Sequence, residues 1–133
     1  VNYYIGLAHE ALGDNATAKK HFTDAAEQAV GRIDVTSYYQ GLSYLKLNDH
    51  AHATEIFNAM IEEANRQLNT EVSNVGLKFG ELEARKARQS RYQTIRGLGY
   101  KGKGENSRAK SDLKSAVELS HSNLWAKAEF EGM

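Results

Sequence analysis

Small and apolar residues recur along this chain at helical spacing, in three segments that align with one another. The segments are YYIGLAHEALGDNATAKKHFTDAA at 3–26, YYQGLSYLKLNDHAHATEIFNAMI at 38–61 and TIRGLGYKGKGENSRAKSDLKSAV at 94–117. The aligned residues are Gly6, Gly41 and Gly97; Leu7, Leu42 and Leu98; Ala18, Ala53 and Ala109; and Phe22, Phe57 and Leu113. In the second part of each segment, the alanine and the large apolar residue four positions later share one face of a helix. Each segment is therefore predicted to be a pair of packed helices.

A tight turn is predicted between the two helices of each pair. One aligned position holds glycine or asparagine, which adopt the left-handed conformation that ends a helix, at Gly13, Asn48 and Gly104. The next position holds a polar residue of the kind that caps a following helix, at Asp14, Asp49 and Glu105. A glycine on the first helix and an alanine on the second let the two helices approach closely, and the large aromatic residue fills the space beside them.

These signals predict a single all-α domain, an α-α superhelix of three helical hairpins at about 2–33, 34–67 and 82–119. The individual helices are expected near 2–12, 15–30, 34–47, 50–67, 82–103 and 106–119. Residues 68–81 form an irregular insert, in which the alternating Val75, Leu77 and Phe79 are expected to tuck under the array. A capping helix at about 121–131 is expected to cover the open apolar end through Trp125 and Phe130.

The residue pattern resembles the tetratricopeptide repeat. The first segment carries the resemblance best, through Tyr3, Ile5, Gly6, Ala8, Gly13, Asp14, Ala18, Phe22 and Ala25. The offset from Gly6 to Gly41 is 35 residues, close to the family period of about 34. The chain also resembles, more loosely, the C-terminal repeat region of large bacterial multi-domain proteins that are often associated with carbohydrate use. The sequence begins with Val1-Asn2 rather than with Met, so a fragment of a longer chain is expected.

The stretch GLGYKGKG at 97–104 fits the dinucleotide-binding glycine pattern and nearly fits a phosphate-binding loop. Such a loop follows a strand and opens a helix, so that backbone N–H groups face the phosphate. Here the stretch closes a predicted helix, and Gly97 and Gly104 are the third copies of aligned glycines. Only Gly102 has no counterpart. No nucleotide or other cofactor is therefore expected.

Composition limits the classes of function. The 133 residues contain no cysteine and no proline, and no apolar run approaches the roughly 20 residues of a membrane span. Absent cysteine fits a reducing, cytoplasmic location. The net charge is zero, but residues 1–65 carry four Lys/Arg against nine Asp/Glu, whereas residues 66–133 carry thirteen against eight. Attraction between the two halves would favour a homo-oligomer.

The resemblance implies that the first helix of each hairpin lines a concave groove that binds a protein or peptide. The candidate groove residues are Tyr3, Leu7, Tyr38, Leu42, Thr94 and Leu98, and Tyr4 and Tyr39 lie on the same helices. The alternative is that these residues pack between helices. The family's carboxylate clamp for chaperone tails needs lysine and asparagine, whereas this chain has Tyr3, Tyr38 and Thr94 at the lysine position and leucine at the asparagine position. Such a tail is therefore not expected as partner.

A basic run between 85 and 103 contains no acidic residue. Four of its side chains fall on one side of a helix, which makes a candidate basic patch of Arg85, Arg88, Arg96 and Lys103. The patch could bind an anionic partner, form an ordinary solvated face, or pair with the acidic first half. Aromatic residues in the run are too few for single-stranded nucleic acid, so no nucleic-acid partner is expected.

No metal or catalytic site is expected. His50 and His52 are two residues apart and diverge by about 200° on a helix, whereas zinc ligands prefer a spacing of three or four. His9 aligns with tyrosines and is expected in the core. No nucleophile stands at recognisable spacing from a base. The sequence thus favours a non-catalytic interaction or scaffolding module. The alternatives are an accessory domain of a larger, perhaps carbohydrate-related enzyme, and a self-association domain.

Overall fold

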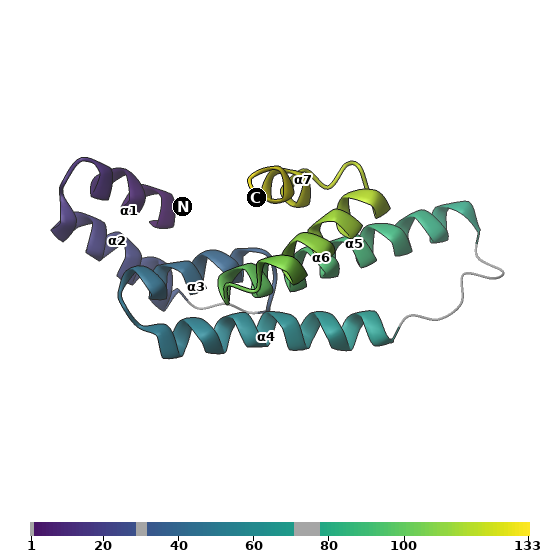
Figure 1. Cartoon of the computed structure of the whole chain (residues 1–133), viewed down its shortest axis with the longest axis horizontal. Coiled ribbons are helices and arrows are strands. Elements are labelled where there is room, and N and C mark those ends of the chain that lie inside the picture. Colours follow the sequence, from purple (N-terminus) through teal and green to yellow (C-terminus); the bar gives the residue numbers. More distant parts are fainter. Residues whose placement is uncertain (1, 29–31, 71–77) are drawn as a thin grey trace.

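The fold was analysed in a computed structural model, which describes residues 2–28, 32–70 and 78–133. These residues form seven helices and no strand: α1 (Asn2–Ala11), α2 (Asn15–Glu27), α3 (Thr36–Lys46), α4 (His50–Asn69), α5 (Phe79–Gly102), α6 (Asn106–Leu119) and α7 (Leu124–Glu131). Consecutive helices pack against one another from α1 to α6, so that three hairpins form a helical solenoid (Figure 1). The predicted all-α superhelix is confirmed.

The three hairpin turns repeat the same backbone geometry. The left-handed residues are Gly13 with φ +79°, Asn48 with φ +61° and Gly104 with φ +81°. The carboxylates of Asp14 and Asp49 then accept the backbone N–H three residues later, each at 3.2 Å. Glu105 stands at the third N-cap without a side-chain capping bond. The turns follow the sequence signals because glycine and asparagine tolerate positive φ and aspartate satisfies an otherwise unpaired N–H.

Several helix boundaries differ from the predicted ones. Helix α2 ends at Glu27, before the predicted residue 30, because Gln28 is extended and the Gln40 side chain of α3 donates hydrogen bonds to the carbonyls of Ala26 and Gln28. Helix α5 begins at Phe79, three residues earlier than predicted, and Glu81 places a negative charge in its first turn. A carboxylate there is favoured by the helix dipole.

The irregular segment between the second and third hairpins is shorter than predicted, because α4 and α5 both extend into it. The predicted positions of Val75 and Leu77 lie outside the described residues. Phe79 does not tuck under the array: it is the first residue of α5 and is exposed.

At the centre of each hairpin, a large side chain of the second helix packs against a glycine of the first helix. A Cβ added at Gly6 would lie 2.5 Å from the Phe22 ring, and one at Gly41 would lie 2.4 Å from the Phe57 ring. In the third hairpin the corresponding Cβ at Gly97 would meet Leu113 at 3.0 Å. The aligned glycines are therefore required by close helix contact.

The same contact explains the glycine that has no counterpart in the other segments. A Cβ added at Gly102 would also lie 2.4 Å from the Phe57 ring, so one phenylalanine is held between Gly41 of its own hairpin and Gly102 of the next. Phe57 is almost completely buried. The glycine-rich stretch at 97–104 is thus a packing surface for α4 and α6 followed by a turn.

Helix α7 lies on the same side of the array as α1 (Figure 1). It packs on α6 and also contacts α3 and α5, the first helices of the second and third hairpins. Trp125 contacts Tyr39 of α3, and Glu129 pairs with Lys101 of α5 at 2.7 Å. Phe130 packs against the main core cluster, and Ala126 is fully buried. Trp125 and Phe130 are thus the anchors that the sequence predicted, but α7 lies across the face of the first helices as well as at the end.

The first prediction concerns the double glycine contact of Phe57. Gly102→Ala should lower the free energy of unfolding by about 1–3 kcal/mol, because the methyl group overlaps a ring that a second glycine already confines. Chemical denaturation followed by circular dichroism measures this. The control is Gly80→Ala in the same helix, where nothing lies within 4 Å of the added Cβ. The free energy of unfolding of that variant should rise by about 0.5–1 kcal/mol. Equal changes in stability for the two variants would refute the packing role of Gly102.

Candidate functional site

The six predicted groove residues divide into two groups. Tyr3, Tyr38, Thr94 and Leu98 are buried, while Leu7 and Leu42 are half-buried. Tyr3 packs on Phe22 with ring centroids 5.9 Å apart, and Tyr38 packs on Phe57 at 6.2 Å in the equivalent contact. A buried side chain offers no surface to a partner. The groove assignment is therefore corrected at the four buried positions, which pack between helices.

Partner-accessible aromatic surface comes instead from the residues that follow the two buried tyrosines. Tyr4 is 54% exposed and donates a hydrogen bond from its hydroxyl to that of Tyr39, at 3.2 Å. The two rings lie 5.4 Å apart between centroids. Trp125 of α7 is 41% exposed and meets the Tyr39 ring edge-on at 5.8 Å. We call Tyr4, Tyr39 and Trp125 the aromatic patch.

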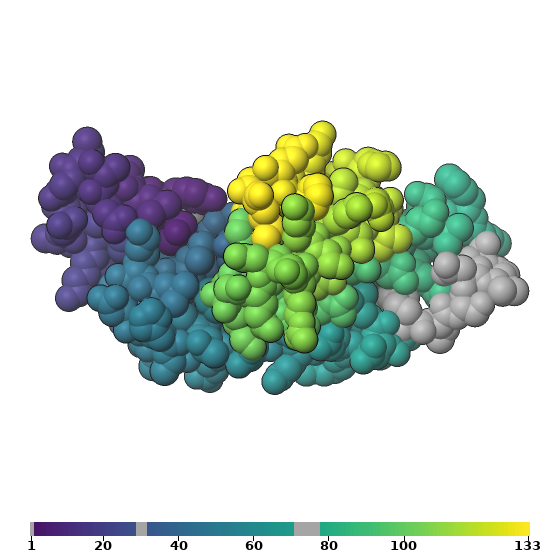
Figure 2. Space-filling view, in the orientation of Figure 1, coloured from purple at the N-terminus to yellow at the C-terminus, as the bar shows by residue number. Residues whose placement is uncertain are grey.

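The aromatic patch brings together three helices that are distant in sequence. Two adjacent tyrosines open the first helix of each of the first two hairpins, so one ring of each pair enters the core and the other remains at the surface. The outline of the molecule dips between α1 and α7 in the space-filling view (Figure 2). Tyr39 of α3 links the two sides, because it contacts Tyr4 as well as Trp125.

Polar contacts fix α7, and with it Trp125, in this position. The Asn123 side chain caps α7 by accepting the N–H of Ala126 at 3.0 Å. Its amide group also donates to the hydroxyls of Ser90 and Thr94 on α5, at 2.8 and 3.0 Å. Thr94, which the sequence assigned to a groove, thus holds the helix that covers this part of α5.

Burial changes the acidity of one tyrosine of the aromatic patch, Tyr39, and of the two buried tyrosines, Tyr3 and Tyr38. Loss of hydration raises the pKa of Tyr3, Tyr38 and Tyr39 above the ordinary value, because the phenolate is less well solvated than in water. All three therefore remain neutral hydroxyls under physiological conditions. The site presents aromatic area and hydroxyl groups and carries no tyrosinate charge.

Two ion pairs join the helices that carry the aromatic patch to one another and to α5. Lys46 of α3 pairs with Glu10 of α1 at 2.7 Å, and Lys101 of α5 pairs with Glu129 of α7 at the same distance. Each pair joins two helices and cancels its own charge.

The candidate basic patch is not assembled as a free cationic surface. Arg96 forms two hydrogen bonds with Asp112, at 2.9 and 2.7 Å, and a third with Asn65 at 3.0 Å. Asp112 raises the pKa of Arg96 through these bonds. Lys103 pairs with Glu105 at 3.5 Å.

The other two members of that candidate patch are half-buried. Arg88 donates to Gln67 at 2.5 Å and lies over the Tyr92 ring, while Arg85 is half-buried on the same helix. The acceptors come from α4 for Arg88, from α4 and α6 for Arg96, and from the turn before α6 for Lys103. Members of the basic run therefore form contacts within the chain.

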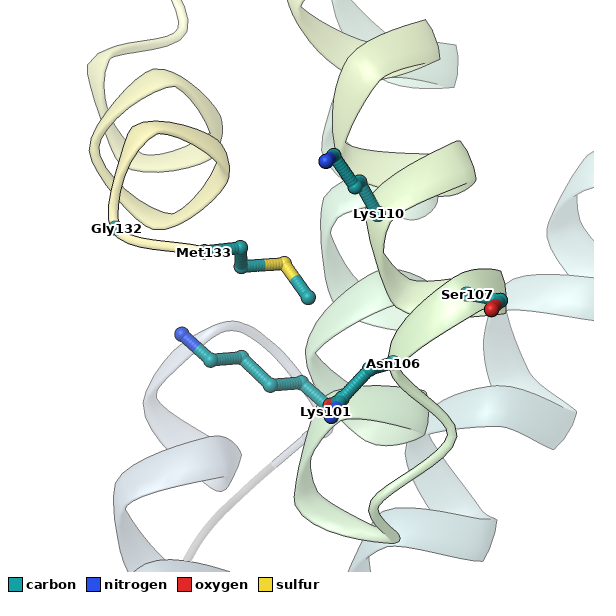
Figure 3. A pocket seen from close by; sticks show the side chains of 6 residues that line it. All are labelled: Lys101, Asn106, Ser107, Lys110, Gly132 and Met133. Atoms are coloured by element: carbon teal, nitrogen blue, oxygen red, sulfur yellow. The ribbon is translucent and has the colours of Figure 1, made fainter.

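A small open cavity of about 400 Å³ lies where α7 ends beside α5 and α6, and its lining includes Lys101, Asn106, Lys110 and Met133. Figure 3 shows the Met133 side chain between the two lysines. Lys101 is engaged by Glu129. The cavity holds neither a nucleophile–base pair nor a set of metal ligands, and we assign it no function.

His9, His21 and His52 contact neighbours in their own hairpins. His9 stacks on His21 with centroids 5.4 Å apart, a contact between α1 and α2 that the alignment with tyrosine did not reveal. His52 bonds to the N-cap Asp49 at 2.6 Å and stacks on Tyr44. Within the described residues, no group of three His, Asp or Glu could hold a metal ion. No described helix is long and apolar enough to cross a membrane.

Residues 1–29, which include α1 and α2, match the family model of the tetratricopeptide repeat. No curated protein and no solved structure matches the chain. The first hairpin is therefore a tetratricopeptide repeat. The two hairpins after it reproduce its left-handed turn and its contact between a glycine and a large side chain. The looser resemblance to bacterial multi-domain proteins stays a prediction.

The second prediction tests the half-buried ion pair between α5 and α6. Asp112→Ala should lower the free energy of unfolding by about 2 kcal/mol or more, because it leaves the Arg96 guanidinium partly desolvated and without its carboxylate. Denaturant unfolding measures the loss. The control is Glu83→Ala, which removes an exposed pair with Lys86 and should change stability by less than about 0.5 kcal/mol. An equally small loss for Asp112→Ala would contradict the structural role.

The third prediction follows from the tyrosine pKa values. A tyrosine whose pKa is raised by folding stabilises the fold below its unfolded pKa, and that contribution is lost as the pH rises above about 10. Stability should therefore fall on the alkaline side, and Tyr38→Phe should make that fall shallower. Denaturant unfolding at several pH values, with tyrosinate absorbance in parallel, measures both. The comparison of the same two proteins at neutral pH is the control, and identical alkaline profiles would contradict the assignment.

Proposed function

We propose that this chain is a non-catalytic protein-interaction module whose aromatic patch binds a segment of a partner protein. The observation that carries the proposal is the meeting of Tyr4, Tyr39 and Trp125 from three helices, with the rings of Tyr4 and Trp125 substantially exposed. The first hairpin is a tetratricopeptide repeat, a family of interaction modules, which supports the same conclusion.

The chemistry of the patch suits protein recognition. Tyrosine and tryptophan present large rigid surfaces at low entropic cost, and each keeps a polar group that can bond to a peptide backbone. The Tyr4 and Tyr39 hydroxyls already lie next to each other, so a backbone carbonyl could accept from one of them without rearrangement. A partner segment with apolar side chains would remove both exposed rings from water.

The position of α7 limits the size of the segment that can bind. Helix α7 covers part of the first-helix face of α5, through Asn123, Trp125 and Glu129. The open part of the face therefore runs over α1 and α3 and ends at Trp125. We expect a short extended or helical segment, with apolar or aromatic contacts in place of a bound terminal carboxylate.

We regard self-association driven by the opposite charges of the two halves as the weaker candidate. Several cations of the basic half are already paired within the chain, among them Arg96, Lys101 and Lys103. We place the module in the cytoplasm, because a chain without cysteine fits a reducing compartment. No nucleic-acid partner is proposed, and an accessory role in a larger enzyme stays a prediction.

The fourth prediction uses the single tryptophan of the chain as a reporter, because Trp125 lies in the aromatic patch. Short peptides selected from a displayed random library should change the Trp125 fluorescence on binding, and Tyr4→Ala should weaken their binding about tenfold. The matched control is Leu124→Ala, which alters an exposed residue next to Trp125 on α7.

Trp125→Ala is tested with labelled peptides by fluorescence polarisation, since it removes the reporter. Circular dichroism verifies that each variant keeps its helices. Selected peptides that bind Tyr4→Ala and Trp125→Ala as tightly as the unchanged protein would place binding elsewhere. A library that yields no binder would overturn the proposal for short segments.

A further inference from the structure

The chain contains seven tyrosines, and four of them gather where α1 meets α3. The rings of Tyr3, Tyr4 and Tyr38 each lie between 5.4 and 5.7 Å from the ring of Tyr39, measured between centroids. Tyr3 and Tyr38 are buried and belong to the cores of their hairpins. The pair of Tyr4 with Tyr39 differs, because Tyr4 is exposed and Tyr39 is half-buried. A reagent in solution can therefore reach this contact between two helices.

The hydroxyl groups of Tyr4 and Tyr39 meet each other directly. Their oxygen atoms lie 3.2 Å apart in a hydrogen bond, and the two rings are inclined by 50°. Among the described residues, this is the only hydrogen bond that joins two tyrosine hydroxyls. In a phenol, the two ortho carbons are bonded to the carbon that carries the hydroxyl. The contact between the hydroxyls therefore brings an ortho carbon of one ring near an ortho carbon of the other.

The ortho carbons are the positions at which an oxidised tyrosine forms new bonds. Loss of one electron and of the phenolic proton gives a neutral phenoxyl radical, whose unpaired electron is shared between the oxygen and the ortho and para carbons. The para carbon carries the rest of the side chain, so two such radicals couple through their ortho carbons. Coupling within one chain is favoured over coupling between two chains, because the two rings are already held together.

We propose that Tyr4 and Tyr39 are a site of oxidative modification, at which a haem peroxidase with hydrogen peroxide joins the two rings as an intramolecular dityrosine. Each tyrosine gives up one electron and one proton, and together these reduce a molecule of hydrogen peroxide to two molecules of water. A carbon–carbon bond then forms between the two ortho carbons. Each coupled carbon releases its hydrogen as a proton and each oxygen regains a proton, so both rings become aromatic again and both hydroxyls persist. The product lacks two hydrogen atoms relative to the unmodified chain.

The new bond joins α1 to α3 covalently, between residues that are 35 positions apart. In the unmodified chain, noncovalent contacts such as the ring contacts and the ion pair of Lys46 with Glu10 hold these two helices together. A crosslink of this length removes the unfolded conformations in which the two helices lie far apart. The first hairpin of the modified chain therefore stays attached to the second. This proposal does not depend on partner binding by the aromatic patch.

The experiment treats the 133-residue chain, at micromolar concentration, with a haem peroxidase and hydrogen peroxide. We expect blue fluorescence excited at wavelengths that tyrosine and tryptophan do not absorb, and a monomer whose mass is lower by two hydrogen atoms. Trypsin cuts after Lys19 and Arg32, so a digest should contain residues 1–19 joined to residues 33–46. Coupling of free tyrosine in a parallel sample verifies that the oxidant is active.

Tyr4→Phe and Tyr39→Phe each keep an aromatic ring at the site but remove its phenol. Either substitution should lower the yield of the joined peptides by about tenfold or more, and circular dichroism verifies that the helices remain. The matched control is Tyr92→Phe, which removes a half-buried tyrosine of α5 and should leave the yield unchanged. An undiminished yield in either variant, a product that consists only of covalent dimers, or no product while free tyrosine is coupled would overturn the proposal.

Discussion

The close contact between a glycine on the first helix and a large side chain on the second is the constraint on which this structure depends. The Phe22 ring occupies the space that a side chain at Gly6 would need, and the Phe57 ring does the same at Gly41 and Gly102. Because Phe57 touches glycines in two hairpins, the contact sets the spacing within a hairpin and also between hairpins. Leu113 makes the looser version of this contact in the third hairpin.

This close approach also decides which aromatic residues reach the surface. Tyr3 and Tyr38 pack against the phenylalanines and become core, while their neighbours, the exposed Tyr4 and the half-buried Tyr39, meet each other. Helix α7 then adds Trp125 from the far end of the chain. The aromatic patch is therefore a consequence of how the hairpins pack, and its residues could bind a partner without weakening the core.

The basic run on α5 shows that a charged stretch of sequence can serve contacts between helices instead of forming a free surface. The basic run on α5 lies between α4 and α6, where Arg96 bonds to Asp112 and Asn65. Lys101 and Lys103 meet glutamates of α7 and of the following turn. Several cations of the second half therefore form contacts within the chain.

The sequence by itself determined the three hairpins, their turns at Gly13, Asn48 and Gly104, and the glycine positions. These features depend on local backbone conformation and on a repeat that can be recognised by aligning the three segments of the sequence. Only the tertiary structure decided the end of α2, the role of Gly102 and the position of α7, because each depends on a residue of another hairpin. It also decided that Tyr4 is exposed and Tyr39 half-buried, whereas Tyr3 and Tyr38 are buried. Adjacent tyrosines on a helix lie about 100° apart, and only the neighbouring helices settle which of the two is covered.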